Sequence, residues 1–349
     1  MWENEIYIND IKGILESNSI NFNKFNDKNI LITGATGIIG SMLVNTLLYA
    51  NKIKKINCNV YAMVRNKEKA EQKFGKQLKE DLNLNIVCND IKEQINIKQK
   101  IDYIIHAASE TSSQNFINNP LETIKTTLLG ARNVLEFAKK NKSEKTIFLS
   151  TMEVYGTPHT DEKIKENHET NLMTDEVRNC YPISKRMAEN IFFSYSETYK
   201  LNIDVLRLTQ TFGPGVNYSD KRVFAEFARC VLEQKNIVLH TKGNTKRNYL
   251  YLGDAISAIL TVLTSNISNE IYNVANEETY CSIYEMAKLV AEKCSNNSIE
   301  VKIEEEDINK YGFAKTLNMN LDTTKIRNLG WEPTTNLEEM YKKLIKTMK

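Results

Sequence analysis

Tyr181 and Lys185 are the residues of this sequence best suited to move a proton, because they stand four positions apart at the start of a predicted helix over 181–200. Residues at i and i+4 share one face of a helix. A tyrosine hydroxyl ordinarily has a pKa of about 10, and a neighbouring ammonium stabilises the phenolate and lowers that pKa. Such a hydroxyl can exchange a proton with an alcohol while a hydride leaves or joins the same carbon. The spacing also occurs by chance in ordinary surface pairs, so its place in the chain decides its weight.

A second hydroxyl stands where a predicted strand ends. Residues 146–150 form a buried strand pattern, and Thr151 follows Ser150 at its carboxyl end. The Tyr181–Lys185 pair lies between this strand and the next one, 203–208. Ligands of open parallel sheets bind outside the carboxyl ends of the strands. We therefore expect Thr151 to hydrogen-bond the reacting oxygen while Tyr181 exchanges the proton.

Glycines spaced three apart join a predicted strand over 29–33 to a helix that continues to about residue 50. In such a turn the first glycine allows the tight bend, the second lets the backbone approach a pyrophosphate, and the third lets helix and strand pack closely. The N–H groups and dipole of the helix N-terminus then stabilise the phosphate charge. The turn predicts a dinucleotide cofactor, held by Gly34, Thr36, Gly37, Ile38, Ile39 and Gly40.

The end of the second predicted strand, 59–64, indicates which dinucleotide to expect. An acid there would bind the ribose 2′-hydroxyl of NAD, but the next residues are Arg65 and Asn66. A guanidinium suits a 2′-phosphate, so NADP(H) is preferred and NAD(H) is the alternative. A solvated surface arginine is the other interpretation of Arg65. After the third strand, 85–88, Asp90 and Ile91 are expected beside the adenine, although a simple turn residue is nearly as common at Asp90.

Strands and helices alternate along the chain, which predicts an α/β fold with a doubly wound parallel Rossmann sheet. After Gly213 the rhythm changes, and the later helices predict a smaller C-terminal substrate-binding lobe. Further strands are expected at 102–106 and 270–275, and helices at 3–16, 67–80, 120–140, 221–234, 253–265 and 282–295. The expected organisation is an N-terminal helical extension, 1–27, a Rossmann domain, 28–212, and a mainly substrate-binding lobe, 213–349, of which 240–275 partly returns to the Rossmann domain.

The composition argues against several partners. The chain of 349 residues has 46 Lys and Arg against 44 Asp and Glu, and a formal charge of +2 gives no electrostatic case for nucleic acid or an anionic membrane. None of the six cysteines forms a C-x-x-C pair, so no metal site is expected. Neither a run of 18 apolar residues nor a signal-peptide pattern appears, which predicts a cytoplasmic protein without a membrane segment.

Taken together, these motifs resemble the extended short-chain dehydrogenase/reductase family, in particular its NAD(P)-dependent sugar-nucleotide epimerase/dehydratase group. The resemblance covers roughly residues 28–345. It is carried by 34–40, His106-Ala107-Ala108, 150–156, Tyr181 with Lys185, Arg207 with 212–214, and 247–249 before Asp254-Ala255. It implies that Thr151, Tyr181 and Lys185 are catalytic, that Ala107 and Ala108 join the cofactor site, and that Arg247 binds a substrate diphosphate. Ser109, Gln210 and Arg222 are expected at the substrate, and the family habit of pairing two helices across a twofold axis implies a homodimer.

Departures from the family pattern bear on the reaction. The 4,6-dehydratases carry an Asp–Glu pair after the threonine, whereas this chain has Met152 and Glu153, and the decarboxylases have Ser–Glu there. Methionine cannot donate a proton, so the acid for loss of hydroxide is missing. Glu153 remains as a catalytic candidate that binds a hydroxyl or acts as a base. Thr127 and Gln210 each stand where Asn is usual, which puts standard substrate contacts in doubt.

The expected reaction follows from Arg65 and Met152. NADPH drives net reduction, so our leading interpretation is reduction of a keto group on a nucleotide-linked sugar, for example a CDP-linked ketose to a CDP-alditol, in capsule or cell-surface polysaccharide precursor synthesis. A nucleotide-sugar 4-epimerase is the second interpretation, and a decarboxylase or dehydratase is the third. A non-catalytic cofactor-sensing scaffold is the alternative outside enzymology, and the intact Thr151, Tyr181 and Lys185 set argues against it.

Overall fold

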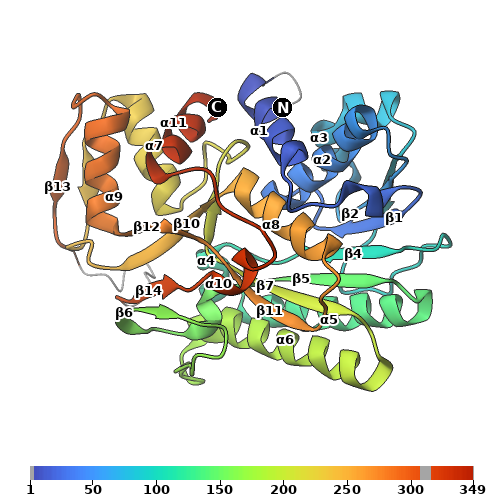
Figure 1. Ribbon diagram of the computed structural model, residues 1–349. Coiled ribbons are helices and arrows are strands. Elements are labelled where there is room, and N and C mark those ends of the chain that lie inside the picture. Colours follow the sequence, from blue (N-terminus) through green and yellow to red (C-terminus); the bar gives the residue numbers. More distant parts are fainter. Residues whose placement is uncertain (1–3, 307–315, 349) are drawn as a thin grey trace.

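The core of the molecule is a parallel sheet (Figure 1). Within residues 4–306 and 316–348, which the computed structural model describes, this sheet has seven strands in the order β11-β7-β5-β4-β1-β2-β3. The direction of winding reverses beside β1, the place where open α/β sheets bind dinucleotides. The predicted fold class is confirmed. The strands are β1 (Asn29–Thr33), β2 (Asn59–Val64), β3 (Leu84–Cys88), β4 (Tyr103–His106), β5 (Lys145–Thr151), β7 (Ile203–Leu208) and β11 (Glu270–Val274).

Helices cover both faces of this sheet because its strands are apolar on both sides. In β1, Ile30 and Ile32 pack into one buried cluster, whereas Leu31 between them packs into the opposite one. The first face is covered by α1 (Glu5–Glu16), α2 (Ile38–Lys54), α3 (Lys67–Glu80) and α8 (Leu252–Thr264). The second is covered by α5 (Pro120–Asn141), which follows the short α4 (Ser113–Asn118), and by α6 (Cys180–Tyr199).

A smaller lobe lies beside the carboxyl ends of the main strands (Figure 1). Its larger sheet runs β12-β10-β14-β6 with β8 beside β10, and β13 pairs β9. These strands are β6 (His159–Ile164), β8 (Gln210–Phe212), β9 (Ile237–Leu239), β10 (Lys246–Tyr251), β12 (Asn276–Ser282), β13 (Val301–Ile303) and β14 (Asn318–Leu321). Its helices are α7 (Val223–Glu233), α9 (Ile283–Leu289) with the π-turn Val290–Cys294, and α11 (Leu337–Thr347). The short α10 (Thr324–Arg327) instead packs beside β11, with Ile326 in the buried cluster of the main sheet. None of the helices in the described ranges is long and apolar enough to cross a membrane.

The first helix is joined to the rest of the chain by a buried carboxylate. Asp10 of α1 accepts a hydrogen bond from the Tyr251 hydroxyl and another from Lys343 Nζ at 2.8 Å. Nearby, Asn45 Nδ2 of α2 donates to the Tyr7 hydroxyl at 2.8 Å. Helix α1 therefore packs on the Rossmann core and contacts α11 of the smaller lobe.

A buried arginine fixes α6 against the sheet. Arg207 of β7 is bonded to Glu189 of α6 by Nε–Oε1 at 3.1 Å and Nη2–Oε2 at 2.7 Å. Its Nη1 also donates to the Tyr155 hydroxyl and to the Glu166 carbonyl, both at 2.8 Å. Ser150 of β5 donates to the same carboxylate at 2.5 Å. A bidentate charged pair of this kind sets both the depth and the rotation of α6.

We expect Arg207→Met to lower the free energy of unfolding by about 3–5 kcal/mol, because it leaves the buried Glu189 charge uncompensated. Adding Glu189→Leu should recover part of that loss, since an apolar pair removes the unpaired charge. Urea denaturation of both variants measures the difference. Lys200→Met, which breaks an exposed pair with Glu197, is the control and should leave the midpoint unchanged. A double variant less stable than Arg207→Met would contradict this account.

Candidate active site

The predicted catalytic residues meet at the carboxyl end of β5. Thr151 is the last residue of β5, and Tyr181 and Lys185 lie one turn apart at the start of α6. The Tyr181 side chain is buried beside Thr151, while Lys185 Nζ donates to the Leu149 carbonyl at 2.8 Å. The Lys185 ammonium also lies 4.6 Å from the centroid of the Phe148 ring. Burial lowers the pKa of Lys185 to about 7, and the nearby Glu189 only partly offsets that effect.

The charges that act on Tyr181 differ from the sequence expectation. Burial raises the pKa of Tyr181, and the negative charge of Glu153 raises it further. The Thr151 hydroxyl and the positive charges of Arg178 and Arg222 lower it. Lys185, to which the spacing assigns this role, is directed instead at a backbone carbonyl of β5. The two arginines therefore supply positive charge that favours the phenolate.

Glu153 is held in an ion pair. It lies in the 3₁₀ turn Met152–Tyr155, and its Oε2 is 2.9 Å from Arg178 Nη1 in the turn Val177–Asn179 that leads into α6. Its backbone N–H donates to Thr151 Oγ1 at 3.2 Å, so the strand end and the turn share one hydroxyl. A carboxylate in a close arginine pair is held in place and serves as a fixed hydrogen-bond acceptor.

The glycine turn has the shape needed for a dinucleotide. Gly34 has φ +66°, and a Cβ built there would lie 2.8 Å from Ala108 Cα. A Cβ on Gly40 would lie 2.4 Å from the Gly34 carbonyl oxygen. Gly37 is the N-cap of α2. Thr36 precedes it in the turn, and Ile38 and Ile39 are the first two residues of the helix. Backbone atoms therefore border this glycine turn, which we call the cradle (residues 34–40). The residues present fit a nicotinamide dinucleotide whose diphosphate lies at the N-terminus of α2.

The ends of β1 and β4 are bound to each other beside this cradle. The Thr33 hydroxyl lies 2.8 Å from His106 Nδ1 and accepts the Ala108 N–H at 3.1 Å. Burial lowers the pKa of His106 to about 3, so the ring is neutral and acts as a packing and hydrogen-bonding group. Ala107 and Ala108 are thereby fixed against Gly34, in the place expected for cofactor-contacting backbone.

The residues expected at the adenosine end lie at the carboxyl ends of β2 and β3. Arg65 is exposed directly after β2, and no ion pair of its side chain is found within 4–306 and 316–348. Asn66 caps α3 by accepting the Lys69 N–H at 2.7 Å. Asp90 Oδ1 accepts the Lys92 N–H at 2.9 Å, and Ile91 is buried. Arg65 is therefore open to a ligand, whereas Asn66 and Asp90 already have local structural partners.

The residues expected at the substrate divide into two groups. Gln210 Oε1 and Arg247 Nε are buried and have no hydrogen-bond partner within the described ranges, on the adjacent strands β8 and β10. Other side chains are already engaged: Arg222 with Asp220 at 2.6 Å, Ser109 with the Glu110 carbonyl, and Thr127 with the Thr123 carbonyl of its own helix. Met152 is buried in an apolar cluster, and its Sδ accepts the Thr209 hydroxyl.

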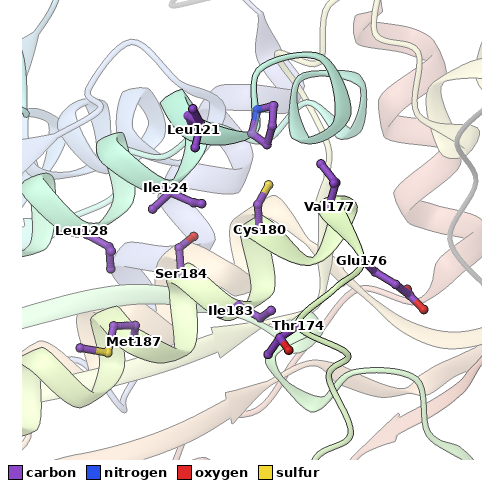
Figure 2. A pocket seen from close by; sticks show the side chains of 11 residues that line it. Leu121, Ile124, Leu128, Thr174, Glu176, Val177, Cys180, Ile183, Ser184 and Met187 are labelled. Atoms are coloured by element: carbon purple, nitrogen blue, oxygen red, sulfur yellow. The ribbon is translucent and has the colours of Figure 1, made fainter.

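A separate apolar pocket of about 500 Å³ lies behind the catalytic helix (Figure 2). Leu121 and Ile124 of α5 face Val177, Cys180 and Met187 across it. Its rim is exposed, with Leu121 at 70% and Val177 at 59% accessibility.

The homodimer expected from the resemblance would pair helices, and it stays a prediction. In the described part of the chain, no group of His, Cys, Asp and Glu is arranged to hold a metal.

Comparison with known proteins agrees with this geometry. Residues 30–275 match the model of the NAD dependent epimerase/dehydratase family. The chain belongs to this family. Family members similar to the chain include UDP-glucuronic acid decarboxylase 3 of Arabidopsis thaliana, 30% identical over 89% of this chain and 86% of that protein. A dTDP-D-glucose 4,6-dehydratase of Dictyostelium discoideum is 28% identical over 89% of this chain and 79% of its own length.

Solved structures of the epimerase/dehydratase family have the same fold. The UDP-glucose 4-epimerase of Thermotoga maritima with UDP-glucose matches with a TM-score of 0.77 at 23% identity, over 91% of this chain and 98% of that one. A dTDP-glucose 4,6-dehydratase of Bacillus anthracis in complex with NAD matches with a TM-score of 0.74. These structures show the shared fold. The family match and the curated relatives make the chain an enzyme of the extended short-chain dehydrogenase/reductase type, as the sequence predicts.

Sequence reasoning missed two residues that lie beside Tyr181 and Glu153. Arg178 lies three positions before Tyr181, just ahead of α6. A cation at a helix N-terminus is unfavourable because the helix dipole is positive there, so a nearby anion is expected. That mismatch is the signal that could have led to the pair with Glu153. Phe116 stacks on the Tyr181 ring with centroids 4.3 Å apart and planes 6° apart. A single phenylalanine in a short helix carries no comparable signal.

Gly34→Ala should abolish tight binding of nicotinamide dinucleotides, because the added methyl group collides with the Ala108 backbone and the left-handed φ disfavours any side chain. Gly75→Ala is the matched control: it lies inside α3, and a Cβ there meets no atom within 4 Å. The control should bind normally and gain about 0.5–1 kcal/mol in stability. Calorimetric titration and thermal melts test both, and unaltered binding by Gly34→Ala would contradict the cradle.

Proposed function

We propose that the enzyme converts a nucleotide-linked sugar through a transient keto sugar, receiving no net electrons from outside. The observation that carries the proposal is the assembled Thr151, Tyr181 and Lys185 set with Met152 beside it in place of an acid. A bound nicotinamide dinucleotide would supply the hydride chemistry, taking a hydride from the sugar carbon and returning one. The protein must then handle the proton of the sugar hydroxyl.

Tyr181 is the residue that would take that proton and later give it back. The Thr151 hydroxyl, at the end of β5 beside Tyr181, would orient the sugar oxygen. Lys185 lies beneath on the same helix, anchored to Leu149. Glu153, fixed by Arg178, would accept a hydrogen bond from a second sugar hydroxyl. A positioned proton-transfer group of this kind contributes roughly 10²–10⁴ to the rate.

The nucleotide diphosphate would lie toward the smaller lobe. Arg247 and Gln210 each keep a buried polar atom without a partner in the described ranges. Such groups ordinarily find one, so a ligand that supplies it is favoured. A guanidinium suits a diphosphate because its planar fork meets two oxygens at once. The curated relatives carry UDP or dTDP in their names, which supports a nucleotide-linked substrate here as well.

The reaction is best assigned to decarboxylation of a nucleotide-linked uronic acid, with 4-epimerisation as its nearest alternative. Dehydration needs an acid for the departing hydroxide, and Met152 cannot serve. Loss of carbon dioxide from a β-keto acid needs no such acid. Similar curated proteins are UDP-glucuronic acid decarboxylases at 27–30% identity, and similar folds include 4-epimerases. These relatives favour this group of reactions over the keto-sugar reduction that we expected first from the sequence.

Reduction of a keto sugar by NADPH is a second candidate, which one observation favours. Arg65 is exposed after β2 with neither an acid beside it nor an ion-pair partner in the described ranges. A 2′-phosphate would fit that guanidinium, and an NADPH-linked enzyme commonly performs net reduction. The comparisons support NAD dependence and leave a preference for NADP(H) as a proposal, and a cytoplasmic location likewise stays a prediction.

The test is one of stoichiometry and product. UDP-glucuronic acid, UDP-glucose and keto forms of CDP- and dTDP-linked sugars are each given to the enzyme with its cofactor. We expect carbon dioxide release from the uronic acid, or a C4-inverted hexose, with no net loss of reduced nicotinamide. Tyr181→Phe should lose about 10²–10⁴ in rate. Sustained one-to-one NADPH consumption on a keto sugar would overturn the proposal in favour of the reductase.

Cofactor choice is tested separately. If Arg65 pairs with a 2′-phosphate, Arg65→Ala should weaken NADPH binding by about 1.5–3 kcal/mol and leave NADH binding nearly unchanged. Fluorescence titration of both cofactors against wild type and variant gives the comparison. Lys67→Ala, an exposed neighbour at the start of α3, is the control. Equal losses for the two cofactors would remove Arg65 from the argument.

A further inference from the structure

Arg178 lies between two groups that act on Tyr181, one through its charge and one through ring stacking. Its Nη1 is 2.9 Å from Glu153 Oε2, and its guanidinium carbon is 5.9 Å from the centroid of the Phe116 ring. Phe116 in turn stacks on Tyr181 at 4.3 Å. Arg178 is thus joined to Tyr181 by two routes, one through the charge of Glu153 and one through the ring of Phe116.

Charged groups face the Tyr181 hydroxyl from several elements. Glu153 comes from the turn after β5, Arg178 from the turn before α6, and Arg222 from the segment before α7. Lys185 lies on the same helix as the tyrosine and is bonded to Leu149. Of these groups only the Glu153 charge opposes a phenolate, and burial opposes it as well. A carboxylate whose charge opposes the phenolate needs a counter-charge.

Arg178 supplies that counter-charge at a structural cost. A cation in the turn leading into α6 opposes the positive end of the helix dipole. Its Nε is buried and has no hydrogen-bond partner among residues 4–306 and 316–348. An arginine in this position is therefore poorly explained by the stability of α6 alone. Its close partner is Glu153, and the ring that it covers is the one stacked on Tyr181.

We propose that Arg178 is a positioning residue for proton transfer: it neutralises Glu153 and holds Phe116 against the Tyr181 ring, so that a phenolate can form beside a carboxylate. The inference rests on the proposed function, because it concerns the same tyrosine. It assigns to an arginine outside the Tyr-x-x-x-Lys motif part of the role that the motif suggests for its lysine.

The test compares Arg178→Met, Arg178→Lys and the double variant Arg178→Met with Glu153→Gln, using UDP-glucuronic acid and UDP-glucose. In Arg178→Met the unbalanced Glu153 charge raises the pKa of Tyr181, so the rise of kcat with pH should move to higher pH. At neutral pH kcat should fall about tenfold for each unit of that movement. KM should change less than about twofold. The double variant should return the pH profile of kcat toward that of the wild type. Arg178→Lys, which keeps the positive charge, should have a profile like the wild type.

Several results would overturn this role. An unchanged pH profile in Arg178→Met would do so, and a raised KM with unchanged kcat would make Arg178 a substrate-binding residue instead. If Arg178→Met does not fold, Glu153→Gln alone tests the inference. Glu153→Gln should move the pH profile of kcat to lower pH, and an unmoved profile would contradict the role of Arg178. Arg186→Met, an exposed arginine of α6, controls for loss of surface charge.

The failures can be told apart. Full activity in Tyr181→Phe would overturn the proposed function itself, whereas an inactive Tyr181→Phe with a wild-type Arg178→Met would overturn only the role of Arg178. If neither sugar is converted, carbon-13 labelling of the tyrosine Cζ in the cofactor-loaded enzyme gives the same comparison without turnover. The Tyr181 resonance, assigned by its loss in Tyr181→Phe, should titrate at higher pH in Arg178→Met and return when Glu153→Gln is added; identical titrations would overturn the inference.

Discussion

The buried pair of Arg207 and Glu189 is the interaction on which the geometry of the site depends. Arg207 is in register with Ser150 across β5 and β7, and Ser150 donates to the same carboxylate. The next residue along β5 is Thr151, and one turn before Glu189 on α6 lies Lys185. The pair therefore fixes the helix that carries Tyr181 and Lys185 against the strand that carries Thr151. Through Tyr155 and the Glu166 carbonyl it also joins the segments beside the smaller lobe.

The main sheet could be predicted from the sequence because its strands are short apolar runs separated by helical periods, as in 29–33 and 203–208. The smaller sheet could not. Strand β6 reads His-Thr-Asp-Glu-Lys-Ile and is largely exposed, and β14 alternates buried and half-buried residues between polar neighbours. Such strands are held by pairing to distant segments, and local pattern does not reveal the partner. The same limit applies to Asp10, whose ion-pair partner Lys343 lies 333 positions away.

Within the site, motif spacing located the residues but not their electrostatics. The spacing of Tyr181 and Lys185 places both on one face of α6, yet the lysine chain continues to the Leu149 carbonyl and to the face of Phe148. Burial of that ammonium lowers its pKa to about 7, so its charge near neutral pH is only partial. Whether a neighbour helps a phenolate depends on distance and on desolvation, and neither is written in an i,i+4 pattern. The glycine turn is the opposite case, because there the backbone conformation itself requires the residue type.

The number of proton-transfer groups beside the sugar limits what the enzyme can do. Each oxidation or reduction of a ring hydroxyl needs one proton to move at that oxygen, and Tyr181 provides for it. Epimerisation needs nothing more. Decarboxylation also requires that a proton be added to the carbon that has lost carbon dioxide. Water or a donor without a fixed position can supply that proton. Dehydration needs both a base at one carbon and an acid at the departing hydroxyl. In this chain the corresponding residues are Glu153, which is ion-paired with Arg178, and Met152, whose buried thioether accepts the Thr209 hydroxyl. The proposed function follows from this limit: it is a reaction in which one tyrosine, Tyr181, would carry the essential proton in both directions.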